Sequence, residues 1–304
     1  MAEVAKRKAP NSSEAVHAIT GTEARARLLA RMPVTERRLE LAGIPTAVLE
    51  GGAGSPIVLL HGPSGYAAHW TRVIPALVGS HRVIAPDLPG HGASHSPDTL
   101  DADRVLAWLG ELIDQTCDSP PALVGQLLGG AIAARFAIAR SDRLSRLVLV
   151  DSFGLRAFQP APDFGLALEQ FLKQPTAQTH RQLWGYCAFD IDTLLQSMGE
   201  VWGSFESYNV DLASRADVQA ALSSLMQAFG FPVIPSRELA RIAAPTTLIW
   251  GRHDLATPLA VAEAASAQFG WPLEVIEACA DDPPMEQPEA LARALLEAVD
   301  DPAL

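Results

Sequence analysis

The stretch Val-Gly-Gln-Leu-Leu-Gly-Gly at residues 124–130 decides the fold of this chain. The apolar run that leads into it, at 122–124, suits a strand buried on both faces, and a helix-period run follows at 127–139. Glycines on both sides of such a turn let the helix approach the strand closely, while the residue between them stands up in a strained conformation. The stretch therefore predicts a strand, a sharp turn with Leu127 at its tip, and a helix.

The same alternation of apolar runs and helix-period segments extends along the chain. Buried strands are predicted at 56–60, 82–85, 122–124, 147–150, 246–250 and 273–276. Helices are predicted at 67–77, 103–116, 127–139, 258–268 and 288–299. Two extended runs, at 37–41 and 46–50, predict an opening hairpin. Alternation of this kind predicts a parallel sheet with helices on both faces.

The alternation breaks once, between Phe153 and Pro235, where several helical stretches occur without a convincing strand. We therefore expect an inserted helical cap at 154–235 and a core made of 35–153 and 236–304. Residues 1–34 are expected to be a polar tail followed by a helix, which begins near Ser13. The aromatic residues of the insertion could line a substrate pocket or fill the small core of the cap.

Composition excludes several kinds of partner. The chain has 304 residues, 35 of them acidic and 23 basic, and its formal charge of −12 repels phosphate backbones and anionic lipid surfaces. We therefore expect neither nucleic acid nor a membrane as a partner. No apolar stretch suits a signal peptide or a membrane span, so a cytoplasmic location is expected. The 3 cysteines are far apart and have no metal-type spacing, which indicates free thiols.

Four segments, taken in order, resemble the motifs of one family. The run H-G-P-S-G at 61–65 resembles an H-G-x-x-G oxyanion loop, and D-L-P-G-H-G at 87–92 resembles a D-x-P-G-x-G turn. The turn at 124–130 resembles a G-x-S-x-G nucleophile elbow, and W-G-R-H-D at 250–254 resembles the segment that carries a triad acid. The region 37–299 thus resembles an α/β-hydrolase-fold protein with a helical lid. This resemblance implies a mostly parallel eight-stranded sheet flanked by helices.

The resemblance also implies where catalytic residues would lie. Leu127 occupies the nucleophile position, Asp254 the acid position and Asp281 the base position. Asp282, the next residue, is a possible alternative to Asp281 at the base position. Asp281 could equally be a helix N-terminal residue whose charge the helix dipole favours. Leucine in an elbow conformation costs about 1 to 3 kcal/mol of strain, so a relaxed turn would indicate that selection on the geometry has ended.

A pocket for a carbonyl oxygen is expected to persist beside this turn. Pro63 has no backbone N–H, so the oxyanion donors would be Ser64 and Leu128. The expected ligand is a small, mainly apolar molecule with a carbonyl group. No metal is expected, because no histidine spacing supports a site, and no cofactor is expected. Neither the identity of the ligand nor the oligomeric state follows from the sequence.

The leucine at the turn and the lack of any histidine after His253 argue against Ser-His-Asp hydrolysis. Loss of the nucleophile or the base costs on the order of a millionfold in a related enzyme, which is about 8 kcal/mol of transition-state stabilisation. The main prediction is therefore a non-hydrolytic, small-molecule-binding relative of the hydrolases. Deliberate inactivation of an ordinary esterase would more often place alanine at the turn.

Two alternatives stay open at this level. The first is a cofactor-free lyase or isomerase that transfers protons on a carbonyl compound with Asp254 and Asp281, because two close carboxylates rarely both ionise. The second is a weak esterase with a displaced nucleophile, which only the oxyanion-like loop supports.

Overall fold

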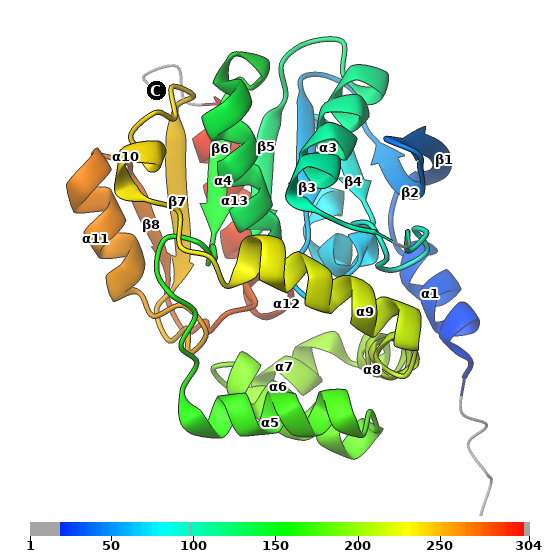
Figure 1. The fold of residues 1–304 in the computed structure, drawn as a ribbon. Helices are drawn as coiled ribbons and strands as arrows, with labels where there is room; N and C mark the ends of the chain where they lie inside the picture. The colour runs from blue at the N-terminus through cyan, green and yellow to red at the C-terminus, as the bar shows by residue number, and fades with distance from the viewer. Residues whose placement is uncertain (1–18, 98, 301–304) are drawn as a thin grey trace, which may run out of the picture.

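A computed structural model of the chain describes residues 19–97 and 99–300. Within these residues, eight strands form one sheet in the order β1-β2-β4-β3-β5-β6-β7-β8 (Figure 1). Their bounds are β1 Thr35–Leu41, β2 Ile44–Gly51, β3 Pro56–Leu60, β4 Arg82–Pro86, β5 Ala122–Gln126, β6 Arg146–Val150, β7 Thr246–Gly251 and β8 Leu273–Ile276. The pairs β1–β2 and β2–β4 are antiparallel and the others parallel, which confirms the predicted hairpin and mostly parallel sheet.

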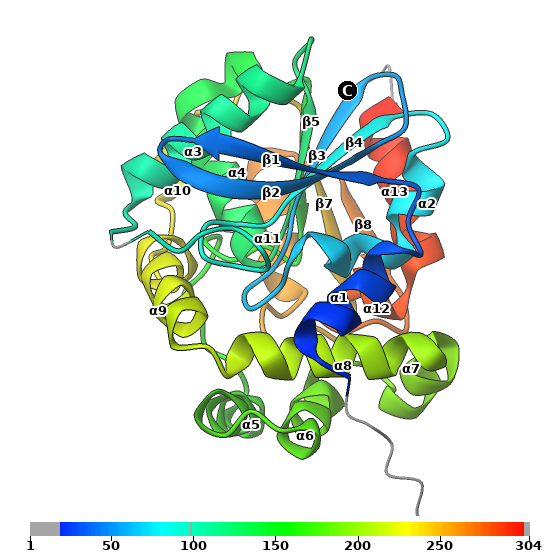
Figure 2. The same cartoon turned by 90° about the vertical axis from the view of Figure 1, so that its right-hand side faces the viewer.

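Helices cover both faces of this sheet (Figures 1 and 2). Those of the core are α1 Gly21–Leu29, η1 Ala67–Arg72, α2 Ile74–Leu77, α3 Ala102–Thr116, α4 Leu128–Arg140, η2 Ser141–Arg143, α10 Ser236–Leu239, α11 Ala260–Phe269, α12 Pro283–Glu286 and α13 Pro288–Asp300. Side chains of α3, α4 and α11 belong to one hydrophobic cluster, and side chains of α1, α2 and α13 belong to a second. The central strands contribute to both clusters, which is why their sequences are continuously apolar.

One predicted helix is broken. The segment predicted at 67–77 forms the 3-10 helix η1, which ends at Arg72, and the short helix α2. Pro75, in the first turn of α2, has no N–H for a bond to the preceding turn, so it can start a helix but cannot continue one. The predicted helix near the N-terminus is described only from α1 onward, where Thr20 and Glu23 form a capping box. The predicted polar tail lies outside the described residues.

Between β6 and β7 the chain forms a group of helices, which we call the inserted helices. They are α5 Pro162–Lys173, α6 Ala177–Cys187, α7 Ile191–Met198, α8 Glu200–Ala213, α9 Ala216–Leu225 and η3 Met226–Gly230. In Figure 1 they lie below the sheet, across the edge at which the parallel strands end. Helix α1 packs closely along α8, and both views show the two helices together.

A helix that crosses a membrane must be both long and apolar. Among residues 19–97 and 99–300, no helix combines the length and the apolar composition that crossing a membrane requires.

Candidate active site

The turn between β5 and α4 keeps the strained geometry that its glycines predicted. Leu127, at its tip, has φ 46° and ψ −108°, a conformation that side-chain-bearing residues rarely adopt. A Cβ on Gly125 would lie 2.4 Å from the carbonyl oxygen of Gly129, so only glycine allows the helix to start this close to the strand. The turn has therefore not relaxed, although it carries a leucine.

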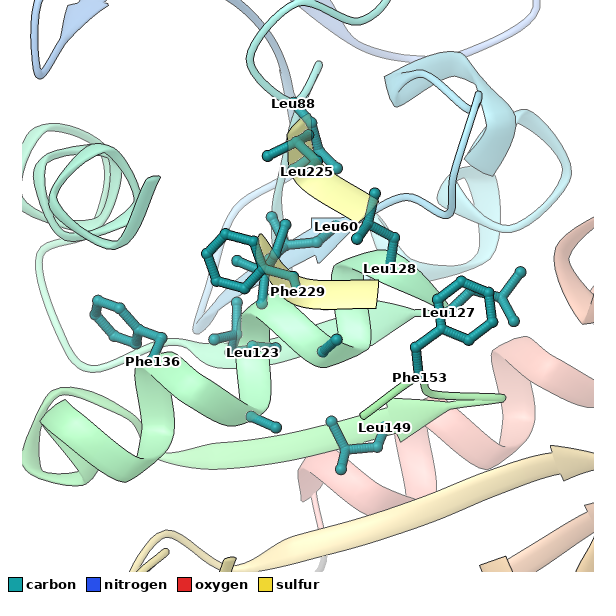
Figure 3. Close-up of a cluster of buried hydrophobic side chains, with 14 of the residues drawn as sticks. Leu60, Leu88, Leu123, Leu127, Leu128, Phe136, Leu149, Phe153, Leu225 and Phe229 are labelled. Atoms are coloured by element: carbon teal, nitrogen blue, oxygen red, sulfur yellow. The ribbon is translucent and has the colours of Figure 1, made fainter. Parts of the chain in front are cut away.

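Two backbone hydrogen bonds hold this turn against the neighbouring strand. The N–H of Leu127 donates to the carbonyl of Val150 at 2.9 Å, and the N–H of Phe153 donates to the carbonyl of Leu127 at 3.1 Å. Figure 3 shows the side chains of Leu127 and Phe153 next to each other, at one end of the hydrophobic cluster. Leu128 is fully buried within that cluster.

A cavity of about 390 Å³ lies between this turn and the inserted helices. From the core it is lined by Pro63, Ser64, Gly65, His69, Leu127, Phe153, Ala256, Asp281 and Asp282, and from the segments that flank the inserted helices by Phe158 and Phe231. From the inserted helices it is lined by Phe164, Leu168, Phe171, Leu172, His180, Leu183, Trp184, Cys187, Asn209, Gln219, Leu222, Ser223 and Met226. Most of these side chains are apolar, and none of the described residues that line it is lysine or arginine. Such a cavity suits a small, largely apolar molecule.

The two predicted oxyanion donors lie at the same edge of the sheet. Ser64 lines the cavity and has φ 55°. Leu128 is the first residue of α4, and the first N–H groups of a helix have no partner within the helix. These N–H groups also form the positive end of the helix dipole. The edge thus offers backbone donors beside the cavity.

Asp254, predicted at the acid position, lies in the loop after β7 and is almost fully buried. Its Oδ1 accepts hydrogen bonds from the backbone N–H groups of Ala256 at 2.6 Å and Thr257 at 2.8 Å, and its Oδ2 accepts from the Thr257 hydroxyl. Burial raises the pKa of Asp254 to about 6 despite these bonds. The carboxyl is thus held firmly by its own loop.

Asp281, predicted at the base position, faces other carboxyl groups. Burial and the neighbouring charges of Asp254 and Asp282 raise its pKa well above the usual value. Its Oδ1 has no hydrogen-bond partner among the described residues. Asp151, at the end of β6, is raised in pKa for the same reasons, burial first and then Asp254, and its Oδ1 accepts from the N–H of Gly251 at 2.8 Å. Asp151, Asp254 and Asp281 thus form a cluster of buried carboxyls, in which the charge of Asp254 raises the pKa of the other two.

Asp282 contacts His69, a residue that the sequence analysis did not assign to the site. The Nε2 of His69 lies 2.9 Å from Oδ1 and 2.8 Å from Oδ2 of Asp282, and both side chains are buried. Asp282 also caps α12, where the N–H of Met285 donates to it at 3.3 Å. His69 belongs to η1, 213 residues earlier in the chain, so no local motif links the pair.

The remaining ring nitrogen of His69, Nδ1, is buried. Because Nε2 lies against a carboxylate, it carries the ring proton, and Nδ1 is then an acceptor. Nδ1 has no hydrogen-bond partner among the residues that the structure describes. His69, Asp282 and Leu127 all line the same cavity. A histidine oriented by a carboxylate is the arrangement by which hydrolases activate an attacking oxygen.

The buried carboxyls are not arranged to hold a metal. Among the described residues, no group of three or more His, Cys, Asp or Glu side chains has positions that could hold a metal ion.

A family model described as the alpha/beta hydrolase family matches residues 57–294. The chain belongs to this family. It is 27% identical to 2-hydroxy-6-oxo-6-(2'-aminophenyl)hexa-2,4-dienoic acid hydrolase of Metapseudomonas resinovorans, over 86% of this chain and 89% of that protein. It is 29% identical to 2-hydroxy-6-oxo-2,4-heptadienoate hydrolase of Pseudomonas putida, over 73% of this chain and 80% of that one.

The fold agrees with solved structures of the family. The 2-hydroxy-6-oxo-6-phenylhexa-2,4-dienoate hydrolase of Rhodococcus sp. strain RHA1 superposes with a TM-score of 0.77, at 23% identity, over 88% of this chain and 99% of that chain. The predicted alpha/beta hydrolase fold is confirmed.

The predicted absence of hydrolysis is wrong, and with it the interpretations as a non-hydrolytic binding protein and as a lyase or isomerase. The relatives that match most of this chain are named as hydrolases of small carbonyl compounds. The prediction rested on the triad positions along the sequence alone. It did not include His69, which comes from η1 and lies against Asp282 only in the folded chain.

Proposed function

We propose that the chain hydrolyses small, largely apolar carbonyl compounds by direct attack of water. His69, oriented by Asp282, takes the proton of that water. The observation that carries the proposal is the buried His69–Asp282 pair, whose Nδ1 has no partner among the described residues and whose two residues line the same cavity as Leu127. The hydrolases to which the chain is similar support the reaction class.

Water is the proposed nucleophile because the tip of the elbow carries Leu127, which has no atom able to form an acyl-enzyme. Position 281, where the resemblance places the base, holds an aspartate. We propose that the roles of the usual triad are divided differently here. His69 is the base, Asp282 orients it, and Leu127 forms part of the apolar floor against which the substrate lies.

The proposed reaction has two steps. In the first, the water oxygen bonds to the carbonyl carbon while its proton passes to Nδ1 of His69, and the N–H groups of Ser64 and Leu128 stabilise the oxyanion. In the second, the bond to the leaving group breaks, and His69 returns the proton to that group. The products are a carboxylic acid and the protonated leaving group.

We propose that residues 154–235, which include the inserted helices, act as a lid that shields these steps from bulk water. Support comes from their position across the cavity, more than half of whose lining residues they supply. Exclusion of water strengthens the hydrogen bonds that an oxyanion receives.

Kinetics of p-nitrophenyl butyrate and 2-hydroxy-6-oxo-6-phenylhexa-2,4-dienoate test the proposal. We expect steady turnover of at least one of them without a burst of p-nitrophenol, because no covalent intermediate forms. We expect His69→Gln to lower kcat/KM by about 10² to 10⁴, the usual contribution of a general base.

The matched control is His95→Gln, which replaces an exposed histidine, and we expect it to stay within twofold of the unsubstituted chain. A His69→Gln variant that is equally active would exclude His69 as the base. Inability of the unsubstituted protein to turn over either compound would contradict the proposed activity.

A further inference from the structure

The wall of the cavity formed by α6 and α8 carries a fixed polar pair. Nδ2 of Asn209 lies 2.9 Å from Nε2 of His180, and both residues line the cavity. An amide nitrogen can only donate, so Nε2 of His180 accepts and the ring carries its proton on Nδ1. That Nδ1 lies 3.8 Å from Oε1 of Glu206, which is too far for a hydrogen bond.

Aromatic packing holds His180 in place. The rings of Phe171, Trp184, Trp202 and Phe205 surround it at centroid distances of 5.4 to 6.0 Å. The side chain is only 1% exposed, and burial lowers its pKa, so the imidazole is neutral at pH 7. A neutral, immobile histidine fixes the amide of Asn209 in one orientation.

Asn209 keeps hydrogen-bonding capacity for a ligand. Its bond to His180 is the one hydrogen bond of its side chain to any described residue, so its carbonyl oxygen and second N–H remain available. Nearby, the side-chain nitrogen of Gln219 donates to the backbone carbonyls of Leu172 at 3.2 Å and Ala213 at 2.5 Å. The carbonyl oxygen of Gln219 is then left as an acceptor at the cavity wall.

The charges of the residues that line the cavity determine which ligands this wall favours. Asn209, Gln219 and the neutral His180 carry no charge, and no described residue that lines the cavity is lysine or arginine. The carboxyls in the lining are Asp281 and Asp282, on the core side. An anionic group would lose its hydration in this cavity without gaining a cationic partner.

We propose that Asn209, positioned by His180, selects substrates that carry a second, neutral hydrogen-bonding group. That group is a hydroxyl, carbonyl or amide, joined by an apolar spacer to the carbonyl at which hydrolysis occurs. The inference rests on the proposed function, because it takes the core end of the cavity as the hydrolytic end. It makes the chain a hydrolase for neutral compounds and disfavours substrates with a carboxylate at the far end.

Binding of three methyl ketones tests the proposal without requiring turnover. Octan-2-one, 8-hydroxyoctan-2-one and 7-oxooctanoate have the same chain length and differ only in the terminal group. Calorimetry is expected to show the hydroxy ketone binding about fivefold more tightly than octan-2-one, which is about 1 kcal/mol and the typical net value of one hydrogen bond. 7-Oxooctanoate is expected to bind most weakly of the three.

Asn209→Leu keeps the size of the side chain and removes its polar atoms, so it should abolish the preference for the hydroxy ketone while octan-2-one still binds. The matched control is Gln196→Leu, an exposed glutamine on α7 outside the cavity lining, which should keep the preference. Equal binding of octan-2-one and the hydroxy ketone to the unsubstituted protein would overturn the proposal. So would tightest binding of 7-oxooctanoate, or a preference that survives in Asn209→Leu.

These results are separable from those of the kinetic assay. Loss of activity in that assay with the ketone preference intact would contradict the hydrolytic mechanism and leave the binding site in place. Turnover without this preference would contradict the proposed role of Asn209 and leave the hydrolytic mechanism in place.

Discussion

Two turns at the same edge of the sheet retain different parts of a hydrolase site. The turn after β5 keeps the strained backbone, with φ 46° at its tip, but presents the apolar side chain of Leu127. The turn after β8 presents two acidic side chains, Asp281 and Asp282, and one of them binds a histidine from a distant part of the chain. The strained backbone geometry therefore lies at the turn after β5, and the acidic side chains lie at the turn after β8.

The turn after β8 shows how strongly surroundings decide the behaviour of identical residues. Asp281 lies among carboxyls, and burial with these neighbours raises its pKa, so it keeps its proton to a higher pH than a free aspartate does. Asp282, the next residue, lies against His69 and can orient it. Because Asp282 is the aspartate that contacts His69, the proposed mechanism uses Asp282 and not Asp281 to orient the histidine.

The largest expected effect separates these two aspartates. We expect Asp282→Asn to lower kcat/KM by at least about a hundredfold, because an amide no longer stabilises the protonated form of His69. Asp281→Asn is expected to stay within about threefold, because asparagine has nearly the same size and leaves the His69–Asp282 pair in place. Kinetics with p-nitrophenyl butyrate would measure both, and losses of equal size would remove the distinction between the two positions.

A second expected effect separates Leu127 from Leu128 at the other turn. Leu128 is fully buried in the core, so Leu128→Ala should lower the free energy of unfolding by about 2 to 5 kcal/mol. Leu127 already borders the cavity, so Leu127→Ala should cost only about 1 kcal/mol, and alanine is as strained at this φ as leucine. Urea denaturation would measure both values. Equal costs would mean that Leu127 packs as a core residue and not as a wall of the cavity.

The sequence predicted the sheet well because each central strand is buried on both faces. Such strands must be continuously apolar, and runs such as 147–150 show this directly. Tight helix–strand contact likewise needs glycine, so Gly125 and Gly129 revealed the elbow. The break between η1 and α2 was missed because a proline near a helix start is compatible with either reading.

The site was predicted less completely, for a different reason. Leu127, Ser64 and Asp281 were placed at the cavity because loops after parallel strands meet at one sheet edge. His69 lies in η1, which follows β3, without any motif of its own, and only the folded chain brings it to Asp282. The one signal in the sequence for this pair was that two aspartates, Asp281 and Asp282, stand where the family pattern has a single base.

The smallest expected effect concerns stability and pH. Because burial raises the pKa of Asp281 well above 3.8, the folded chain keeps this proton at pH values where the unfolded chain has lost it. Stability is therefore lost as pH rises above about 4 and through the folded pKa. Asparagine does not titrate, so the melting temperature of Asp281→Asn relative to the unsubstituted protein should rise by about 3 °C or more between pH 5 and pH 8.

The exposed Asp142 provides the control, because Asp142→Asn removes the same charge from the surface and should show no such trend. A melting-temperature difference for Asp281→Asn that is constant with pH would mean that Asp281 is ionised in the folded chain. Asp281 would then compete with Asp282 as the carboxylate that serves the site. The distinction between the two aspartates would then rest on the contact of Asp282 with His69 alone.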